Sequence, residues 1–200
     1  MNNWIRIALS DCPDQPWANK DGTTRQLLAW PATDLWSLRV SVATISQSGP
    51  YSKLPHTRRW QNILQGSVIL TIHDHKVHLD RQSDPFAFDG EEPCDCELVQ
   101  GPAQALNIMT RGSFSAKVSR IRNNAGLVGV KDALPFEACL DKYVLVGVYA
   151  QAPTRVEQNG QSIDLEPAQW LWSDTPTPTP EQIGIYSDDA VLVLLEGITK

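Results

Sequence analysis

GPYSKLPHTRRWQNILQG, residues 49–66, decides the fold because it combines a turn-rich segment, a strand and a glycine corner. Residues 67–72, SVILTI, follow as a β-branched and largely apolar strand. A polar break, HDHK, comes next, and the strand pattern resumes at residues 77–79, so residues 66–79 are predicted to form a β-hairpin. A strand, a glycine corner and a hairpin in this order predict a small antiparallel barrel.

Alternation along two other strands predicts which side chains share a face. In LWSLRVSVATI, residues 35–45, one face of the strand carries Arg39, Ser41 and Ala43, because successive strand residues point to opposite sides. This polar and small face looks either into a pocket or out to solvent. In LNIMT, the same rule places Asn107 and Met109 together. A polar amide beside a thioether favours a pocket wall over a solvent-exposed face.

Short runs with strand character, separated by turn residues, make the remaining chain all-β. Strands are expected at residues 5–9, 23–30, 35–45, 86–88, 97–99, 106–110, 114–118, 126–130, 143–149, 169–173 and 190–195. RVEQNGQSIDL is predicted to be a hairpin, since Asn-Gly is a strong two-residue turn signal. Residues 134–140 could form a short helix or a turn, and DTPTPTP is predicted to be an extended loop.

Two hairpins are followed by similar elements, which indicates an internal repeat. The first, turned at residues 74–75, precedes an aromatic pair and an acidic turn at residues 86–89. The second, turned at residues 159–160, precedes an aromatic pair and an acidic exit at residues 170–174. The repeat predicts two stacked β-barrel modules.

The length of the chain suits two such modules in one unit, residues 1–200. We expect a first module over about residues 1–125 and a second over about residues 126–200, with exchange of strands between them.

Charge and composition exclude several classes of partner. The net charge of −6 and a pI near 5.1 argue against nucleic-acid or anionic-membrane binding, which requires a basic face. The N-terminus shows no signal peptide, and no stretch is long enough to span a membrane. We expect a cytoplasmic protein, which could be a homodimer. The cysteines, Cys12, Cys94, Cys96 and Cys139, are then expected to be reduced thiols.

The order of strand, corner and hairpin is that of a cupin barrel, the double-stranded β-helix. In metal cupins, a His-x-His pair and a Glu before the corner converge on one ion. Counting back from the corner places Arg59 at the Glu position. The His-x-His positions fall on Lys53 and Pro55 or on Ser52 and Leu54, none of which is a suitable ligand. We therefore expect no metal and no other cofactor, and an arginine whose planar fork suits a carboxylate.

An alternative metal cluster is His73-Asp74-His75 with His78. Asp74 and His75 lie at the predicted hairpin tip, where the second repeat has Asn-Gly. A solvated turn is therefore expected there. A bound metal at these side chains would instead favour a metal-dependent cupin enzyme of the isomerase or dioxygenase type.

Several segments in the first three-fifths of the chain match the motif pattern of one known family. They are PWANKDGTTR at 16–25 (PW-x-N-G-G-G-x-T-R-E), RVSVA at 39–43 (WR-x-S-x-A), GPYSKLP at 49–55 (GPFS-x-FPG), Arg59 (D-R), LQG at 64–66 (L-E-G), PFAFDG at 85–90 (P-F-x-F-x-G) and the run at 101–111 (GP-x-x-D-x-N-V-M-x-R). Together they make the chain resemble the HutD/Ves family of bicupins.

The resemblance implies a bicupin fold and no established catalytic activity. Histidine-utilisation members of the family are thought to sense or bind a small acidic intermediate of that pathway. In this chain the family aspartate before Arg59 is Arg58, and the aspartate two residues before Asn107 is Ala105. These changes predict a more cationic pocket than the family pattern has.

We predict a metal-free cupin that binds a small carboxylate-bearing metabolite, such as a histidine catabolite, in a sensing or regulatory role. Arg59 is the predicted anchor and Asn107 the orienting group, and no catalytic residue is assigned because no serine or cysteine has a recognisable base partner. The other candidate ligand-binding residues are Met109, Ser52, Tyr51, Arg39, Trp17, Asn19, Thr24 and Arg25. The last four either cover the barrel mouth or pin the N-terminal segment. An interaction scaffold with a filled barrel is the remaining alternative.

Overall fold

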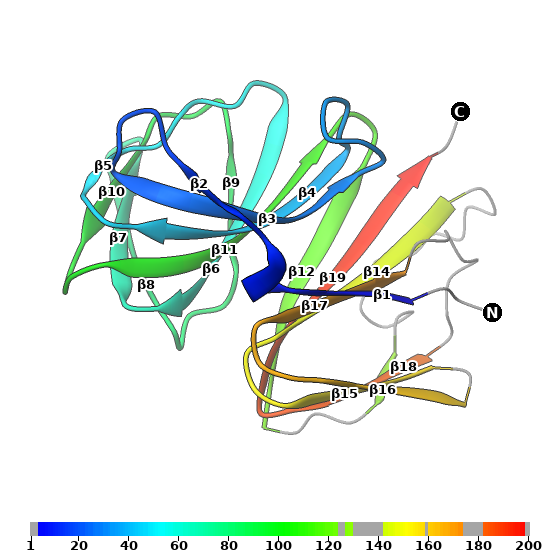
Figure 1. Cartoon of the computed structure of the whole chain (residues 1–200). Coiled ribbons are helices and arrows are strands. Elements are labelled where there is room, and N and C mark those ends of the chain that lie inside the picture. Colours follow the sequence, from blue (N-terminus) through cyan, green and yellow to red (C-terminus); the bar gives the residue numbers. More distant parts are fainter. Residues whose placement is uncertain (1–3, 124–126, 130–141, 159, 174–181, 199–200) are drawn as a thin grey trace. The chain divides into compact units, whose positions relative to one another are not determined.

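The computed structural model describes residues 4–123, 127–129, 142–158, 160–173 and 182–198, and strands make up most of this part (Figure 1). The helical structure in these residues is one short 3-10 turn, η1 (Leu9–Asp11). None of the described helices has the length and apolar character needed to cross a bilayer. The all-β prediction is therefore confirmed. Residues 134–140 and the Pro-Thr run lie outside the described residues.

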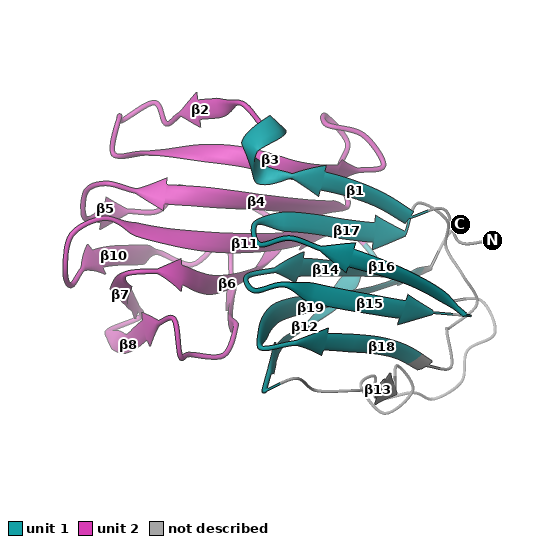
Figure 2. Ribbon diagram, turned by 60° about the horizontal axis from the view of Figure 1, so that its bottom comes forward, with its two compact units in different colours: residues 1–11, 113–200 teal, residues 12–112 magenta. Residues whose placement is uncertain are grey.

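The chain divides into two compact units, which Figure 2 shows in different colours. We call residues 12–112 the first unit; they are magenta and keyed as unit 2 in Figure 2. We call residues 1–11 with residues 113–200 the second unit; they are teal and keyed as unit 1. Each unit contains two sheets and its own cluster of buried apolar side chains. Each therefore has the layered construction by which a β-domain buries one face of each sheet.

Two strand pairings account for where the division falls. The N-terminal strand β1 (Trp4–Ala8) pairs along its length with β17 (Gln169–Ser173), so it belongs to the second unit. Strand β12 (Ser115–Arg122) pairs with β19 (Asp189–Ile198) in the same unit. The division between residues 112 and 113 consequently lies upstream of the boundary expected near residue 125.

The first unit is built from a six-stranded and a four-stranded antiparallel sheet. The larger sheet has the order β2 (Asp14–Pro16), β3 (Gly22–Trp30), β4 (Leu38–Ile45), β11 (Ala103–Arg111), β6 (Thr57–Gln65) and β9 (Phe86–Asp89). The smaller sheet has the order β5 (Gly49–Pro50), β10 (Cys94–Leu98), β7 (Ser67–Ile72) and β8 (His75–Asp80). The neighbouring strands β4, β11 and β6 form the floor on which the site is built (Figure 2).

The hairpin predicted after the glycine corner is confirmed as β7 paired with β8. Val68, Leu70 and Ile72 are buried at alternate positions, as expected for a strand with one face on the core. The turn itself consists of His73 and Asp74, with φ of 45° and 64°, and not of residues 74–75. Positive φ at both central residues is the backbone of the two-residue turn that matches strand twist.

The glycine corner at Gly66 is required by its geometry. Its φ is +77°, which side-chain-bearing residues rarely adopt, and a Cβ there would lie 2.8 Å from the carbonyl oxygen of Pro102. The β11–β6 register shifts between Gln104 and Ala105, beside this corner. The corner therefore brings two backbones closer together than any other residue would allow.

The second unit has a five-stranded and a four-stranded sheet. The first has the order β1, β17, β14 (Lys142–Ala150), β19 and β12. The second has the order β13 (Leu127–Gly129), β18 (Gln182–Ser187), β15 (Thr154–Gln158) and β16 (Gln161–Leu165). The predicted hairpin in RVEQNGQSIDL is confirmed as β15 and β16. Strand β18 was not predicted, although its isoleucines alternate, because it directly follows the Pro-Thr run.

Candidate functional site

The first unit contains a cavity of about 390 Å³ on the inner face of its larger sheet. All the candidate residues predicted from sequence, except Arg25, line it. The complete lining is Trp17, Ala18, Asn19, Thr24, Arg39, Ser41, Ala43, Ile45, Pro50, Tyr51, Ser52, Leu54, Arg59, Asn107 and Met109. Ile45 also belongs to the apolar core cluster of this unit, so the cavity begins where the core ends.

Strand register places two arginines in one row across the cavity floor. Met109 on β11 is paired with Arg39 on β4 and with Arg59 on β6. Directly opposed residues of antiparallel strands project from the same face of the sheet. At about 4.8 Å per strand, the two arginine Cα atoms are roughly 10 Å apart. We call Arg39, Met109 and Arg59 the arginine row.

Arg59 is buried, with 8% of its surface exposed, and it has no carboxylate partner among the described residues. Its Cζ lies 5.1 Å from the ring centroid of Tyr51 and 4.8 Å from that of Phe88. Its Nε is buried and makes no hydrogen bond. Burial lowers the pKa of the Arg59 guanidinium, and the charge of Arg39 acts in the same direction. A guanidinium nevertheless stays protonated in proteins, so the cavity carries a fixed positive charge.

A tryptophan supports the other end of the arginine row. Trp36 is buried, and its ring centroid lies 5.3 Å from Cζ of Arg39 and 3.9 Å from Cζ of Arg111. Arg111 also donates a hydrogen bond from Nε to Oγ1 of Thr57 at 2.9 Å. Burial lowers the pKa of Arg39, and repulsion from Arg111 lowers it further. The aromatic face thus holds two like charges near one another by cation–π attraction.

A second row of polar side chains lies next to the arginine row. Asn107 on β11 is paired with Ser41 on β4 and with Gln61 on β6, and we call these three the polar row. Gln61 donates from Nε2 to the hydroxyl of Tyr51 at 2.9 Å. The Asn107 amide makes only a long bond, 3.4 Å, to the carbonyl of Ala105. Asn107 therefore keeps hydrogen-bonding capacity for a molecule in the cavity.

The N-terminal segment of the first unit contributes Trp17 and Asn19 to the cavity lining. Trp17 donates from Nε1 to Oγ1 of Thr24 at 2.8 Å, and its ring packs where a side chain on Gly22 would stand. Arg25 is elsewhere, because its Nη2 pairs with Oδ2 of Asp14 at 2.8 Å in an exposed ion pair. The prediction that Arg25 binds ligand is not supported by this placement, since alternation along β3 turns it away from Thr24.

One other expectation about charged residues needs correction, and one agrees with the structure. Arg58 is exposed, because it alternates with Arg59 on β6, so it does not add charge to the pocket as expected. The cavity's second arginine is Arg39 instead. His73 and His75 are exposed, and Nδ1 of His73 lies 3.6 Å from Oε1 of Glu92. Within the described residues, no three His, Cys, Asp or Glu side chains are arranged to hold a metal ion.

The cysteines of strand β10 are buried free thiols beside the cavity wall. Cys94 and Cys96 share the inner face, as alternation requires, and neither forms a disulfide. Burial raises the pKa of Cys94 to about 11, although the charge of Arg59 opposes the shift. Burial also raises the pKa of Cys96 and raises that of Tyr51 well above its ordinary value. These groups therefore stay neutral near pH 7, and thiolate chemistry is disfavoured.

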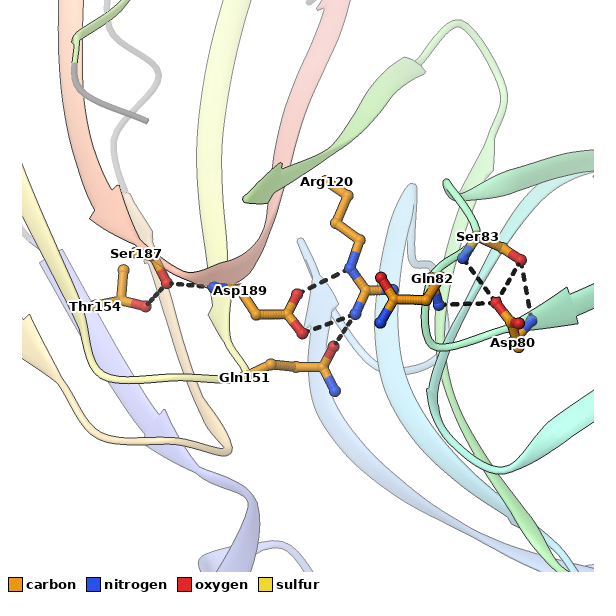
Figure 3. A network of polar contacts seen from close by, with 8 residues as sticks. All are labelled: Asp80, Gln82, Ser83, Arg120, Gln151, Thr154, Ser187 and Asp189. Carbon is orange, nitrogen blue, oxygen red and sulfur yellow. Dashed lines mark hydrogen bonds and ion pairs between the residues drawn. The ribbon is translucent and has the colours of Figure 1, made fainter. Parts of the chain in front are cut away.

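The second unit contains a buried arginine with a different environment (Figure 3). Arg120 donates from Nε and Nη2 to the two carboxylate oxygens of Asp189, both at 2.8 Å, and from Nη2 to Gln151 at 2.8 Å. The backbone N–H of Asp189 donates to Oγ of Ser187 at 3.2 Å, and that hydroxyl lies 2.8 Å from Oγ1 of Thr154. Arg120 is thus matched by a carboxylate of the chain, whereas Arg59 is not.

The other network in Figure 3 belongs to the first unit and closes the loop after β8. Oδ1 of Asp80 accepts hydrogen bonds from the backbone N–H groups of Gln82 and Ser83 at 2.8 and 3.0 Å. These bonds hold the pKa of Asp80 below its ordinary value. None of these residues lines the cavity, so this network is a turn and not part of the site.

Some cavity residues were not selected as binding candidates from sequence. Alternation from Arg39 along β4 gives Ser41, Ala43 and Ile45, and all of them line the cavity. The sequence signal was present, but the period of two does not tell which face of a strand looks inward. Leu54 carries no such signal, because it lies in an irregular segment between β5 and β6.

Comparison with known proteins places the chain among a group of bacterial relatives. The family model described as HutD matches residues 9–188. Protein Ves of Escherichia fergusonii is 36% identical over 110 residues, which cover 53% of this chain and 58% of that protein. A 21.2 kDa protein in the hutC 3′ region of Pseudomonas putida is 29% identical over 112 residues, covering 54% and 59%. The chain thus matches little more than half the length of these curated relatives.

Solved structures show the same fold over nearly the whole chain. HutD from Pseudomonas fluorescens SBW25, from a formate condition, has a TM-score of 0.77 at 22% identity, covering 96% of this chain and 98% of that one. A mutant of oxalate decarboxylase OxdC from Bacillus subtilis has a TM-score of 0.63 at 7% identity, covering 100% and 78%. The prediction of a cupin-type β fold is confirmed.

Proposed function

The chain belongs to the HutD/Ves family, and from this premise we propose that its first-unit cavity binds a small carboxylate-bearing metabolite in a sensing or regulatory role. One observation carries the proposal. Arg39 and Arg59 face the cavity, and neither has a carboxylate partner among the described residues. An anion from solution would supply the missing charge.

The charge balance of the lining supports an anionic ligand. The ionisable lining side chains are the two arginines and Tyr51, and the lining includes no acidic side chain. A desolvated guanidinium without a partner is costly, because burial removes the water that stabilised its charge. A carboxylate can accept two parallel hydrogen bonds from one guanidinium, which adds geometric specificity. The unpartnered Nε of Arg59 is one donor for this purpose.

The polar row supports a defined orientation of the ligand. Ser41 and Asn107 are both buried and both line the cavity next to the arginine row. Their hydroxyl and amide groups can donate to a second ligand oxygen or accept from a ligand N–H. Asn107 accordingly takes the orienting role predicted from sequence, and Arg59 the anchoring role.

The lining favours binding over catalysis. General acid–base catalysis near pH 7 requires a group that exchanges a proton in that range. The lining side chains include no His, Asp, Glu, Lys or Cys, and the raised pKa of Tyr51 keeps its phenol neutral. An acid bound here would meet fixed charges and hydrogen bonds, which suits a sensor. An organic acid formed in histidine catabolism is consistent with the hutC-adjacent relative from Pseudomonas putida.

A thermal-shift titration tests the proposal. Purified protein in a buffer without carboxylates or phosphate is titrated with formate, acetate and a panel of amino-acid catabolites, with sodium chloride and neutral amides as controls. A ligand at one hundred times its Kd should stabilise the folded state by about 2.7 kcal/mol. Arg59→Gln should abolish the shift, and Arg58→Gln, on the opposite face of β6, should leave it unchanged. Equal shifts in both variants would contradict the proposal.

Metal analysis separates the proposal from a metal-dependent enzyme. Protein purified without an affinity tag is analysed for iron, manganese, nickel and zinc. A stoichiometric metal that disappears in His73→Ala with His75→Ala would favour the enzyme. The open cavity of about 390 Å³ argues against a scaffold with a barrel filled by its own side chains.

A further inference from the structure

We infer that the ligand is an amphipathic acid, whose acidic group meets the arginine row while an uncharged aliphatic or aromatic part occupies the other end of the cavity. The inference rests on the proposed function and adds the substrate class and its orientation. It follows from how side chains change in character along the cavity floor.

Two floor strands, β4 and β6, change from basic through polar to apolar in the same direction, and β11 changes from Asn107 to Ala105 over the last two of these rows. On β4 the cavity-facing side chains are Arg39, Ser41, Ala43 and Ile45 in order. Strand register places Ala105 beside Ala43, so β11 ends its own series at an alanine.

The same change occurs on β6. Ile63 pairs with Ala105, one row beyond the pairing of Gln61 with Asn107. Ala43, Ala105 and Ile63 therefore form an apolar row, and all three are buried. Ala43 lines the cavity, whereas Ala105 and Ile63 belong to the core cluster behind this end. Three rows, one basic, one polar and one apolar, thus succeed each other along the floor.

The apolar end is closed by further apolar groups. Ile45 and the indole of Trp17 line the cavity at this end. The hydroxyl next to Ala43 among the lining residues is that of Thr24, which already accepts the indole N–H bond. Ala43 lies four residues from Arg39, which is about 13 Å at the rise of a β-strand. Acetate spans only a small part of this distance, so a ligand that reaches the apolar row while its carboxylate remains at the arginine row must carry a longer tail.

The lining also predicts which ligands are rejected. A second charge at the far end of the ligand would be desolvated beside Ala43 and Ile45, where no lining side chain of opposite charge is present. An ammonium would in addition be repelled by the two arginines. Monoacids with an uncharged tail should therefore bind better than diacids or amino acids of equal length.

Three six-carbon acids that differ only at the far end test the inference. Binding of hexanoate, adipate and 6-aminohexanoate to the full-length protein is measured by calorimetry, with acetate as the short reference. Each buried methylene strengthens binding by roughly fourfold. Hexanoate should therefore bind at least about tenfold more tightly than acetate, and more tightly than adipate or 6-aminohexanoate. Equal or tighter binding of adipate would overturn the inference.

A substitution at the apolar row locates the tail. Ala43→Leu fills the space next to Ala105, so the ratio of the acetate and hexanoate dissociation constants should fall from about tenfold or more to about one. A ratio unchanged from wild type would contradict the assigned orientation. The wild-type ligand series decides the question even where this variant does not fold. If no acid binds, acetate included, the proposed function itself fails. If acetate binds and hexanoate gains nothing, only this inference fails.

Discussion

Replacing Arg59 with methionine is expected to stabilise the unliganded protein while abolishing its affinity for acids. Methionine is apolar, flexible and long enough to fill much of the arginine's space. The change removes a buried guanidinium that lacks a carboxylate partner among the described residues and whose Nε makes no hydrogen bond. A group kept for a ligand is expected to reduce the stability of the empty site.

The magnitude follows from opposing contributions. An unmade hydrogen bond at a buried donor costs about 1–3 kcal/mol. The contacts of Arg59 with the rings of Tyr51 and Phe88 each offset about 0.5–1 kcal/mol of this. The substitution also removes the cost of desolvating the guanidinium charge. Arg59→Met should therefore raise the free energy of unfolding by about 1 kcal/mol. For a chain of this size the midpoint of thermal unfolding should rise by about 2–4 °C.

Arg120 provides a matched control in the second unit. Its side chain is 1% exposed and forms a two-bond ion pair with Asp189. Arg120→Met removes both hydrogen bonds and the ion pair from that buried carboxylate, so it should lower the free energy of unfolding by about 3–5 kcal/mol. Urea unfolding of both variants is measured in a buffer without carboxylates, and repeated with saturating acid. If Arg59→Met destabilises the empty protein as strongly as Arg120→Met, Arg59 is a structural residue and the reasoning is refuted.

Three further predictions address the corner, the thiols and the ionic character of the site. Gly66→Ala should lower the free energy of unfolding, measured in urea, by about 2 kcal/mol or more, and Gly101→Ala by about 1 kcal/mol. Both glycines have positive φ, but only at Gly66 would a Cβ lie against backbone atoms. Equal losses for the two variants would contradict this reasoning. Burial raises the pKa of Cys94 from 9.0 to about 11, so the contribution of the neutral thiol to stability is complete below pH 9 and is lost as the pH rises through 11. The loss is on the order of 2 kcal/mol. Urea midpoints of Cys94→Ala should therefore fall less steeply between pH 9 and 11 than those of wild type. Affinity for acids should be constant from pH 6 to 9, because neither guanidinium nor carboxylate titrates there; a calorimetric transition near pH 6.5 would show that a histidine participates.

The sequence was sufficient to predict nine of the fifteen side chains that line the cavity but not the contacts between strands. Alternation predicted that Arg39 shares a face with Ser41, and Asn107 with Met109, since the period of two is a local property of the backbone. The arginine row depends on the pairing of β4, β11 and β6, strands that are far apart in the chain. Nothing local in the sequence encodes such a register.

The same limit explains the incorrect expectations. TRRW contains adjacent arginines, and alternation allows only one of them to face inward, so counting both Arg58 and Arg59 toward the pocket was a wrong inference. Arg25 was selected through a motif, but its ion pair with Asp14 depends on the pairing of β2 with β3. Membership of β1 in the second unit likewise follows from a pairing across almost the whole chain.

The motif spacing predicts a guanidinium at the position where metal cupins use a carboxylate ligand, and this would change what the barrel can do with an acid. A bound divalent ion can accept oxygen ligands in several geometries and can activate a bound water. Arg59 offers a planar, fixed set of donors, and its charge does not change near neutral pH. In the proposed function, such a site selects an acid by shape and by the polarity of its tail. The three rows along β4, β11 and β6 are then proposed to serve recognition: charge fixes one end of the ligand, and the apolar end distinguishes between acids.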